Sequence, residues 1–488
     1  MLLSNKFWEP FHRCGQRRAA PKPYNEIPIK KMNQPMNSNQ LLPPIPFLRQ
    51  AAGLLLLCTV AFAPTRAAAQ KSIAFEKYTL SNGLNVILHV DRQTPIVAVT
   101  VSYHVGSKDE DPTRTGFAHF FEHLLFEGSE NIARGEYMKL VKENGGVLNA
   151  NTFKDRTFYF EILPSNQLEL ALWMESERML HAKIDQKGIE TQREVVKEER
   201  RQRVDNTPYG GLLDETMLRT FAKHPYKRSV IGSMDHLNSA KKEEFLAFYK
   251  KFYVPDNAIL SIAGDIDPRQ AKQWIERYFG GIPRGATPIK RTVVKEPEQK
   301  KEVRDKVYDN IQLPAVIHSY KTPALGAPDY HAANLLATLL SEGESSRFQK
   351  SIVNTQQKAL FVGAYPIAMK EAGVSLMFGI VNMGVEPEQL EEAMEKEYER
   401  VRTELITQQE YDKLMNQVEN TFVNSLSTVE GIAETLSDYW MYQGDPDQVN
   451  TEMDRYRNVT REQIREVARK YLQPSNRTTL YYLPKPKS

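Results

Sequence analysis

Cysteine is almost absent from this chain, with only Cys14 and Cys58 among its 488 residues. Two thiols exclude a disulfide framework and a zinc site built from cysteines. The formal net charge is only +3, although 26% of the residues are charged, so the composition gives no case for a nucleic-acid partner. No apolar run in the sequence approaches the roughly 20 residues that a membrane-spanning helix needs. The length predicts two to four domains with more than one full hydrophobic core.

Residues 1–69 are predicted to be a leader and a secretory signal rather than part of the fold. Residues 51–63 form a short apolar run after Arg49, and the small residues that follow it are typical of a cleavage site. Such a signal would direct the chain to the periplasm or the exterior. Its cleavage after Ala69 would remove both cysteines. The basic leader leaves a mitochondrial presequence as the alternative, and it leaves a translation start at Met32 or Met36 open.

The functional interpretation starts from residues 119–123, His-Phe-Phe-Glu-His, an H-x-x-E-H pattern. Residues four apart lie on one face of a helix, so His119 and His123 point the same way. Two imidazoles at that spacing can bind one zinc ion, each at about 2.0–2.1 Å. Glu122 reaches the same side, where it can take a proton from an attacking water. The pattern is the inverted counterpart of the H-E-x-x-H zinc motif.

The neighbours of these three residues favour a metal site over coincidence. Two histidines and a glutamate at helical spacing also arise by chance in a chain of this length. Here they lie within a helix whose other residues are almost all apolar: Phe117, Ala118, Phe120, Phe121, Leu124, Leu125 and Phe126. Burying polar side chains in such a helix is costly unless something satisfies them, and a metal ion would do so.

The order of predicted elements occurs twice along the chain. Periodicity predicts an Asn-Gly hairpin over 75–90, a strand over 96–105, the motif helix, and further helices over 168–181 and 186–203. Residues 281–302 are rich in Gly, Pro and charge and are predicted to be a linker between domains at 73–280 and 303–484.

The second domain is expected to repeat the fold of the first without its metal ligands. Residues 329–344 parallel the motif helix. Aligning the two helices places these residues opposite His119, Glu122 and His123: Asn334, Ala337 and Thr338.

From about Tyr78 to Tyr481 the sequence resembles the pitrilysin, insulysin and mitochondrial-processing-peptidase family of zinc peptidases. That family follows H-x-x-E-H with a third ligand in a run like E-R-x-V-V-x-x-E, and residues 192–199 fit this run. The resemblance implies that Glu199 is the third ligand. The adjacent Glu198 is the alternative, although it points about 100° away on a helix. Gln192 stands where the family often has an acid, which leaves a supporting carboxylate there open.

The resemblance also implies substrate-binding residues. Residues 145–152 are similar to the family's G-G-x-x-N-A-x-T edge strand, which pairs with an extended substrate peptide; Asn149 and Ala150 are its landmarks. Arg347 matches an arginine that holds substrate together with a tyrosine. Phe361 stands near the tyrosine position, Tyr365 is out of register, and Phe has no hydroxyl to donate. This departure suggests that a homologous subunit supplies the complete Arg/Tyr pair.

The resemblance therefore implies an endopeptidase that binds one Zn²⁺ per chain and acts on peptides or unfolded protein segments, and the leader adds that it is exported. The expected fold is α+β: two homologous α/β-sandwich halves, each a mixed sheet with helices packed on one face, joined by a linker like a clamshell. The alternatives are a scaffold subunit that lacks activity and a protein that captures unfolded peptides without cutting them. A homodimer, a heterodimer with a sister chain and a lone chain all stay open.

Overall fold

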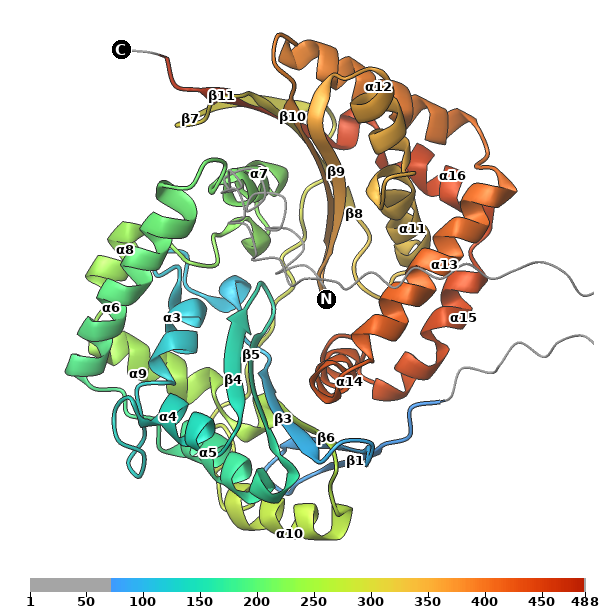
Figure 1. Ribbon diagram of the computed structural model, residues 1–488. Coiled ribbons are helices and arrows are strands. Elements are labelled where there is room, and N and C mark those ends of the chain that lie inside the picture. The colour runs from blue at the N-terminus through green and yellow to red at the C-terminus, as the bar shows by residue number, and fades with distance from the viewer. Residues whose placement is uncertain (1–71, 487–488) are drawn as a thin grey trace, which may run out of the picture. The chain divides into compact units, whose positions relative to one another are not determined.

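The structure is a computed structural model, and it describes residues 72–486. The predicted leader, secretory signal and translation start lie outside the described residues. Residues from Ile73 onward form a single unit, and the two predicted halves follow one another within it (Figure 1). No helix between residues 72 and 486 has both the length and the apolar character that crossing a bilayer requires.

The first half contains a six-stranded sheet in the order β1-β2-β6-β3-β5-β4. Only β2 and β6 pair in parallel, and the other neighbours are antiparallel. The strands are β1 (Glu76–Thr79), β2 (Asn85–Val90), β3 (Ile96–Tyr103), β4 (Val147–Thr152), β5 (Thr157–Pro164) and β6 (Ala258–Gly264). The strand β4 is therefore an edge of the sheet.

The second half contains a five-stranded sheet in the order β7-β11-β8-β10-β9. Its strands are β7 (Val303–Asp309), β8 (Ala315–Thr322), β9 (Ala359–Ala368), β10 (Gly373–Val381) and β11 (Arg477–Pro484). The parallel pair is β7 with β11, and the rest is antiparallel. This topology repeats that of β2-β6-β3-β5-β4, so the predicted α+β fold with two homologous halves is confirmed.

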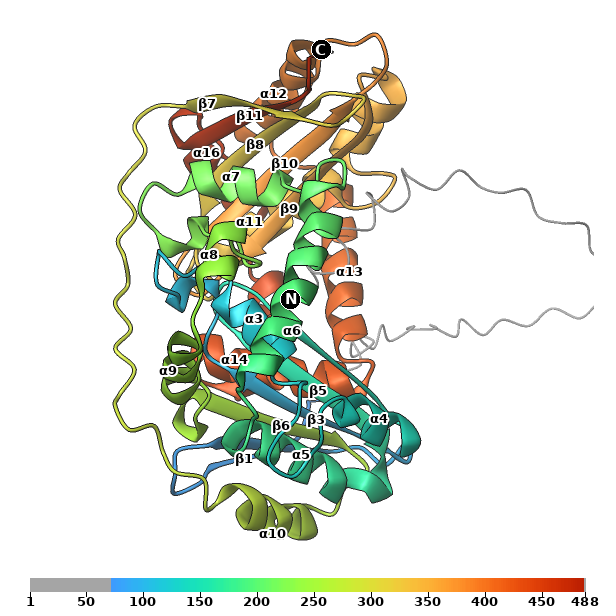
Figure 2. The same ribbon diagram turned by 90° about the vertical axis from the view of Figure 1, so that its left-hand side faces the viewer.

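Each half covers one face of its sheet with its own helices (Figures 1 and 2). The first half contributes α3 (Phe117–Leu124), α4 (Glu136–Glu143), α5 (Leu168–Leu180), α6 (Gln186–Arg200), α8 (Met234–Ser239), α9 (Lys242–Phe252) and α10 (Pro268–Phe279). The second half contributes α11 (Tyr330–Ser341), α12 (Pro387–Thr403), α13 (Gln408–Ser425), α15 (Glu452–Arg457) and α16 (Arg461–Tyr471).

The opposite face of each sheet is contacted by one helix from the other half. The helix α14 (Val429–Gln443) packs on β3 and β6, and α7 (Leu212–Thr220) packs on β8 and β11. In Figure 1, α14 lies across β3 and β6 from α3 and α5. This arrangement explains why β6 is buried along its whole length, because a strand covered on both faces needs an unbroken apolar run. Each half thus has its own hydrophobic core, and a further cluster of buried residues between the first sheet and α14 joins the two halves.

Residues 281–302 contain neither helix nor strand. Figure 2 shows this segment running along one side of the protein from α10 to β7. Arg291 donates to Asp109 and to the carbonyl of His104 in the first half. Glu296 accepts hydrogen bonds from three successive backbone N–H groups that begin at Ala222. The segment is thus held at defined points, while the domain boundaries at 73–280 and 303–484 stay a prediction.

Candidate metal centre

The motif residues lie on α3, whose other side is buried among aromatic rings. Phe117, Phe120 and Phe121 pack against Phe245 of α9 with ring centroids 4.6–5.8 Å apart. This apolar side anchors the helix against the first domain. The polar residues are left on the remaining side, where the rings of His119 and His123 lie one turn apart with centroids 4.9 Å from each other.

Both ends of α3 are held by buried polar side chains. The helix has no side-chain cap of its own, because its N-cap is Gly116. The carboxylate of Glu110 instead accepts hydrogen bonds from the N–H groups of Gly116 and Ala118, both 2.9 Å long. At the other end, the fully buried Arg178 donates to the carbonyl of Leu125 at 2.9 Å. These bonds satisfy backbone groups that a helix leaves unpaired at its ends, and they fix where the histidines point.

The structure brings Glu199 of α6 to the two histidines. Its Oε2 atom lies 3.0 Å from Nε2 of His123 and 3.5 Å from Nε2 of His119. Ligands at about 2.0–2.1 Å from a tetrahedral zinc ion are separated by roughly 3.3 Å. The two measured separations bracket that value. Glu198 instead pairs with Arg201 and Gln202 at the surface, so the structure favours Glu199 over its neighbour.

The donor atoms of these three residues suit a zinc ion. Among residues 72–486, they form the only group of three or more His, Cys, Asp or Glu side chains that can hold a metal. Oε2 of Glu199 is buried without a hydrogen-bond partner. An unsatisfied buried carboxylate oxygen is costly, and a cation would satisfy it. Two imidazoles and a carboxylate are also a ligand set of catalytic zinc sites.

Electrostatics keep the free ligands ready for a cation. Burial lowers the pKa of His119 to about 4, so its imidazole is neutral near pH 7 and has a lone pair to donate. Burial alone would raise the pKa of Glu199. The proximity of His123 and His119, together with the charge of Arg203, outweighs burial and lowers that pKa to about 2. The site therefore presents a neutral imidazole at His119 and an anionic carboxylate at Glu199.

Glu122 lies on the same side of α3 and touches the edge strand β4. The hydroxyl of Thr152, at the end of β4, donates to its carboxylate at 2.6 Å. Burial raises the pKa of Glu122, and the hydrogen bond from Thr152 and the charge of His123 offset only part of this rise. A raised pKa brings a carboxylate closer to the range in which it can both accept and return a proton near neutral pH.

One edge of β4 pairs with β5, and the other edge pairs with no strand of the first sheet. The strand ends at Thr152, which contacts the Glu122 carboxylate. Asn149 is exposed and Ala150 is buried. The side chain of Asn149 accepts from the N–H of Ala150 at 2.9 Å, so this amide already has a local partner. β5 pairs with β4 on one side only. An unpaired edge of this kind can accept an extended peptide as an added strand.

Three contacts around the ligands were not foreseen from the sequence. Gln192 donates to the buried carboxylate of Glu127, which also pairs with Arg134. An acid is therefore present beside position 192, supplied by a residue that follows α3. Just beyond the end of α6, Arg203 pairs with Oε1 of Glu199 at 2.8 Å. This ion pair occupies one carboxylate oxygen and leaves Oε2 facing the histidines.

Arg347 and the aromatic residues of β9 lie in the second half. Arg347 is buried, and its guanidinium binds the carboxylate of Glu410 at 2.9 and 3.2 Å. Phe361 and Tyr365 are four residues apart on β9, so they share one face of the strand. Both rings pack against Phe378 of β10, with centroids 5.3 and 5.7 Å away. Tyr365 thus offers its phenol on the face that also carries Phe361.

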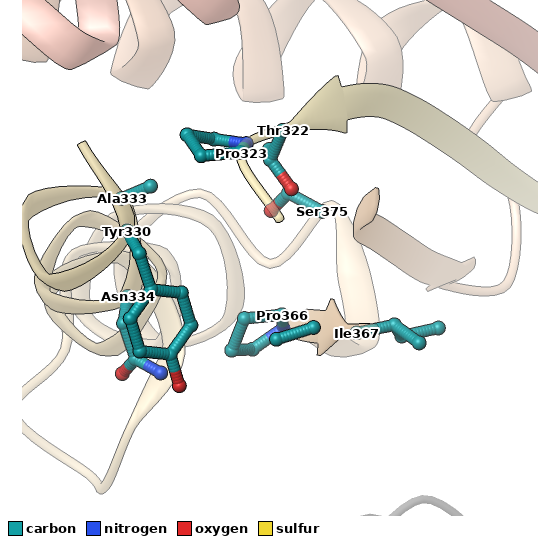
Figure 3. A pocket seen from close by; sticks show the side chains of 9 residues that line it. Thr322, Pro323, Tyr330, Ala333, Asn334, Pro366, Ile367 and Ser375 are labelled. Atoms are coloured by element: carbon teal, nitrogen blue, oxygen red, sulfur yellow. The ribbon is translucent and has the colours of Figure 1, made fainter. Parts of the chain in front are cut away.

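The second half has no metal ligands at the positions equivalent to the motif. Ala337 and Thr338 are buried in α11. Asn334, opposite His119, lines a small pocket between α11 and the ends of β8 and β9. In Figure 3, Asn334 and Tyr330 lie side by side on α11. The cavity measures about 10 Å³, which is at best the space of one water molecule.

Gly116 is predicted to be required for the metal centre. Its φ is +93°, and a Cβ atom there would lie 2.6 Å from the carbonyl oxygen of Ile231. Gly116→Ala should therefore reduce the free energy of unfolding by about 2–4 kcal/mol, since backbone strain and overpacking each cost about 1–3 kcal/mol. It should also weaken zinc binding. Denaturant unfolding without zinc and a competitive zinc titration measure the two effects.

Gly135 provides the matched control for this substitution. It is also the N-cap of a helix, α4, with a φ of +80°, but no atom lies within 4 Å of its would-be Cβ. Gly135→Ala should cost about 1 kcal/mol from backbone strain alone and leave zinc binding unchanged. Equal losses in the two variants would contradict the role assigned to Gly116.

Known proteins match both halves of this chain. Residues 85–234 match the profile described as insulinase (peptidase family M16), and residues 239–418 match the profile described as peptidase M16 inactive domain. The zinc protease PqqE of Helicobacter pylori is 30% identical over 412 residues, which span 84% of this chain and 93% of that protein. The match to the inactive-domain profile agrees with the absence of metal ligands from α11.

Solved structures share the fold. A protease from Helicobacter pylori has a TM-score of 0.81 at 29% identity, with 85% of this chain and 100% of that chain covered. The periplasmic protease PqqL from Escherichia coli has a TM-score of 0.70 at 17% identity, and the match covers 84% of this chain but only 47% of that one. The profile matches and the extent of the PqqE match show that this chain belongs to peptidase family M16, whose named members include zinc proteases.

Proposed function

We propose that this chain is a zinc-dependent endopeptidase that binds one zinc ion through His119, His123 and Glu199 and cuts extended peptides. The observation that carries the proposal is the convergence of three donor atoms from two helices, including a buried carboxylate oxygen with no hydrogen-bond partner. The M16 relatives named as zinc proteases support it.

Each residue of the centre has a distinct task in this proposal. The unpaired edge of β4 holds the substrate backbone in an extended form, with Asn149 and Ala150 beside the bond to be cut. When bound, zinc supplies a Lewis acid that polarises the scissile carbonyl and makes water more acidic. Glu122 takes the proton from the attacking water and returns it to the leaving amine, while Thr152 holds its carboxylate in place.

We further propose that the active form contains a second subunit of the same fold. Arg347 is engaged by Glu410 within its own half, and Phe361 lacks a hydroxyl, so this chain does not present the Arg/Tyr pair to its own metal centre in the expected form. The chain of PqqL contains about as much sequence again beyond the part that matches. A sister chain that carries both the arginine and the tyrosine would supply the corresponding part here.

Export is part of the same proposal. The leader sequence favours secretion, and the solved relative PqqL is described as periplasmic. The chain would then act on peptides or unfolded segments in the periplasm or outside the cell, with a mitochondrial location as the alternative.

The test is to measure zinc content and peptide cleavage on the same purified chain. We expect one zinc per chain, cleavage of an unfolded protein substrate, loss of cleavage with a chelator and recovery on addition of zinc. If cleavage requires a homologous chain, the second-subunit proposal is supported. A chain that binds no zinc, or that binds zinc and peptide but never cuts with or without a homologous chain, is instead the scaffold or the peptide-capturing protein.

A further inference from the structure

The tip of the β9–β10 hairpin contacts the first half through buried polar groups. The tip, residues 369–372, joins the end of β9 to the start of β10. The N–H of Lys370 donates to Asp155 at 3.1 Å, and the N–H of Glu371 donates to the hydroxyl of Tyr226 at 3.0 Å. Tyr226 donates in turn to Asp155 at 2.8 Å. Asp155 and Tyr226 are buried, so the hairpin tip is fixed by bonds shielded from water.

The side chain of Glu371 adds a buried ion pair to this contact. Its Oε1 lies 2.7 Å from Nζ of Lys108, and its Oε2 lies 3.0 Å from Nε2 of His224. Lys108 also pairs with Asp155 at 2.8 Å. Only 6% of the Lys108 side chain and 12% of the Glu371 side chain are exposed. Because buried charges are costly without partners, Glu371 strongly favours one position of Lys108.

Lys108 belongs to the short loop that leads into the metal helix. Residues 107–109 form a single 3-10 turn, and Glu110 follows it directly. Glu110 then holds the N-terminus of α3 by its two hydrogen bonds to Gly116 and Ala118. Arg228 donates to the carbonyls of both Lys108 and Glu110, so the two residues are held as one piece. His119 follows Ala118 immediately.

We propose that Glu371 is a positioning residue for the metal centre: through Lys108, it fixes the loop whose Glu110 orients the helix that carries His119 and His123. This inference rests on the proposed zinc site. It gives the half without metal ligands a defined task, since a hairpin of that half sets the position of a helix in the other. Zinc ligands placed by a displaced helix would bind the ion more weakly and hold the reacting groups less well.

The experiment compares Glu371→Ala with Asp438→Ala. Asp438 lies on α14 and forms a second buried ion pair between the halves, with Arg156, but no hydrogen bond or ion pair joins it to residues 107–110. Both variants remove one carboxylate from the contact between the halves. Glu371→Ala keeps the backbone N–H that binds Tyr226. Three quantities are measured on the full chain: the zinc dissociation constant by chelator competition, kcat and KM, and the free energy of unfolding without zinc.

Glu371→Ala should raise the zinc dissociation constant about three- to tenfold, a usual size for coupling between sites. It should lower kcat by a similar factor and leave KM unchanged, because the edge of β4 is not touched. Glu371→Gln retains an oxygen that accepts from Lys108, so it should fall between the parent and Glu371→Ala. Asp438→Ala should lose stability but keep its zinc dissociation constant within twofold of the parent.

The inference is wrong if Glu371→Ala binds zinc with the parental dissociation constant. It is also wrong if Asp438→Ala loses as much zinc affinity as Glu371→Ala, because the loss would then reflect the general contact between the halves. If Glu371→Ala does not fold, parental zinc binding by Glu371→Gln overturns it in the same way. A parent chain that binds no zinc overturns the proposed function as well. If the parent binds zinc and cuts peptides, and the Glu371 variants have the parental zinc dissociation constant and kcat, only the positioning role of Glu371 is wrong.

Discussion

Glu122→Gln leaves zinc bound and reduces kcat for peptide cleavage by about 10²–10⁴-fold, the usual contribution of a general base. Gln has nearly the shape of Glu and keeps an oxygen that accepts from Thr152, so the geometry of α3 should survive. What it loses is the ability to take a proton. Among residues 72–486, no other carboxylate hydrogen-bonds to Thr152, the last residue of the edge strand β4, so no second base stands at this place.

Two measurements separate loss of the base from loss of the site. The zinc content of Glu122→Gln should equal that of the parent, and its KM should change little, since neither the ligands nor β4 are altered. Glu130→Gln is the matched control: Glu130 follows the motif by a few residues, its side chain is 73% exposed, and it pairs with His181. Cleavage by Glu122→Gln at near the parental rate would show that another group is the base.

The fold was predictable wherever local patterns decide the structure. The Asn-Gly turn gives the β1–β2 hairpin, and the apolar run of residues 258–264 gives the buried strand β6. The crossing of α14 onto the sheet of the first half was not predictable, because an amphipathic helix shows which of its faces is buried but not which partner buries it. The same limit applies to α5, where the apolar residues Leu170 and Trp173 are only half-buried.

The metal centre was predictable in part for a similar reason. His119, Glu122 and His123 lie within one helical turn, so spacing alone brings them together. Glu199 lies in a helix that is rich in charge, and nothing in the local pattern separates it from Glu194 or Glu198. Only the resemblance to a family singled it out. Glu110 and Arg178 were not predicted, because the sequence does not show whether a Glu or Arg side chain is buried or exposed. Only the fold shows that both are buried.

Glu199→Gln should lower zinc affinity by about 10²-fold or more and abolish cleavage at ordinary zinc concentrations. The substitution replaces the only anionic ligand by a neutral amide, and carboxylates, not amides, are the oxygen ligands of protein zinc sites. The side chain is 15% exposed and its Oε2 faces both histidines. Without zinc, the variant should unfold at a lower denaturant concentration than the parent at pH 7, because the ionised Glu199 is stabilised in the folded chain by Arg203 and the histidines, as its lowered pKa of about 2 indicates.

Glu198→Gln is the control that the chain itself offers, since it changes the adjacent residue in the same way. The Glu198 side chain is 53% exposed and pairs with Arg201 on the surface of α6. Surface pairs of this kind contribute about 0–1 kcal/mol, so its zinc affinity and kcat should match those of the parent. A chelator titration on both variants decides between the two glutamates. Loss of zinc in Glu198→Gln, or parental affinity in Glu199→Gln, would show that Glu199 is not the third ligand.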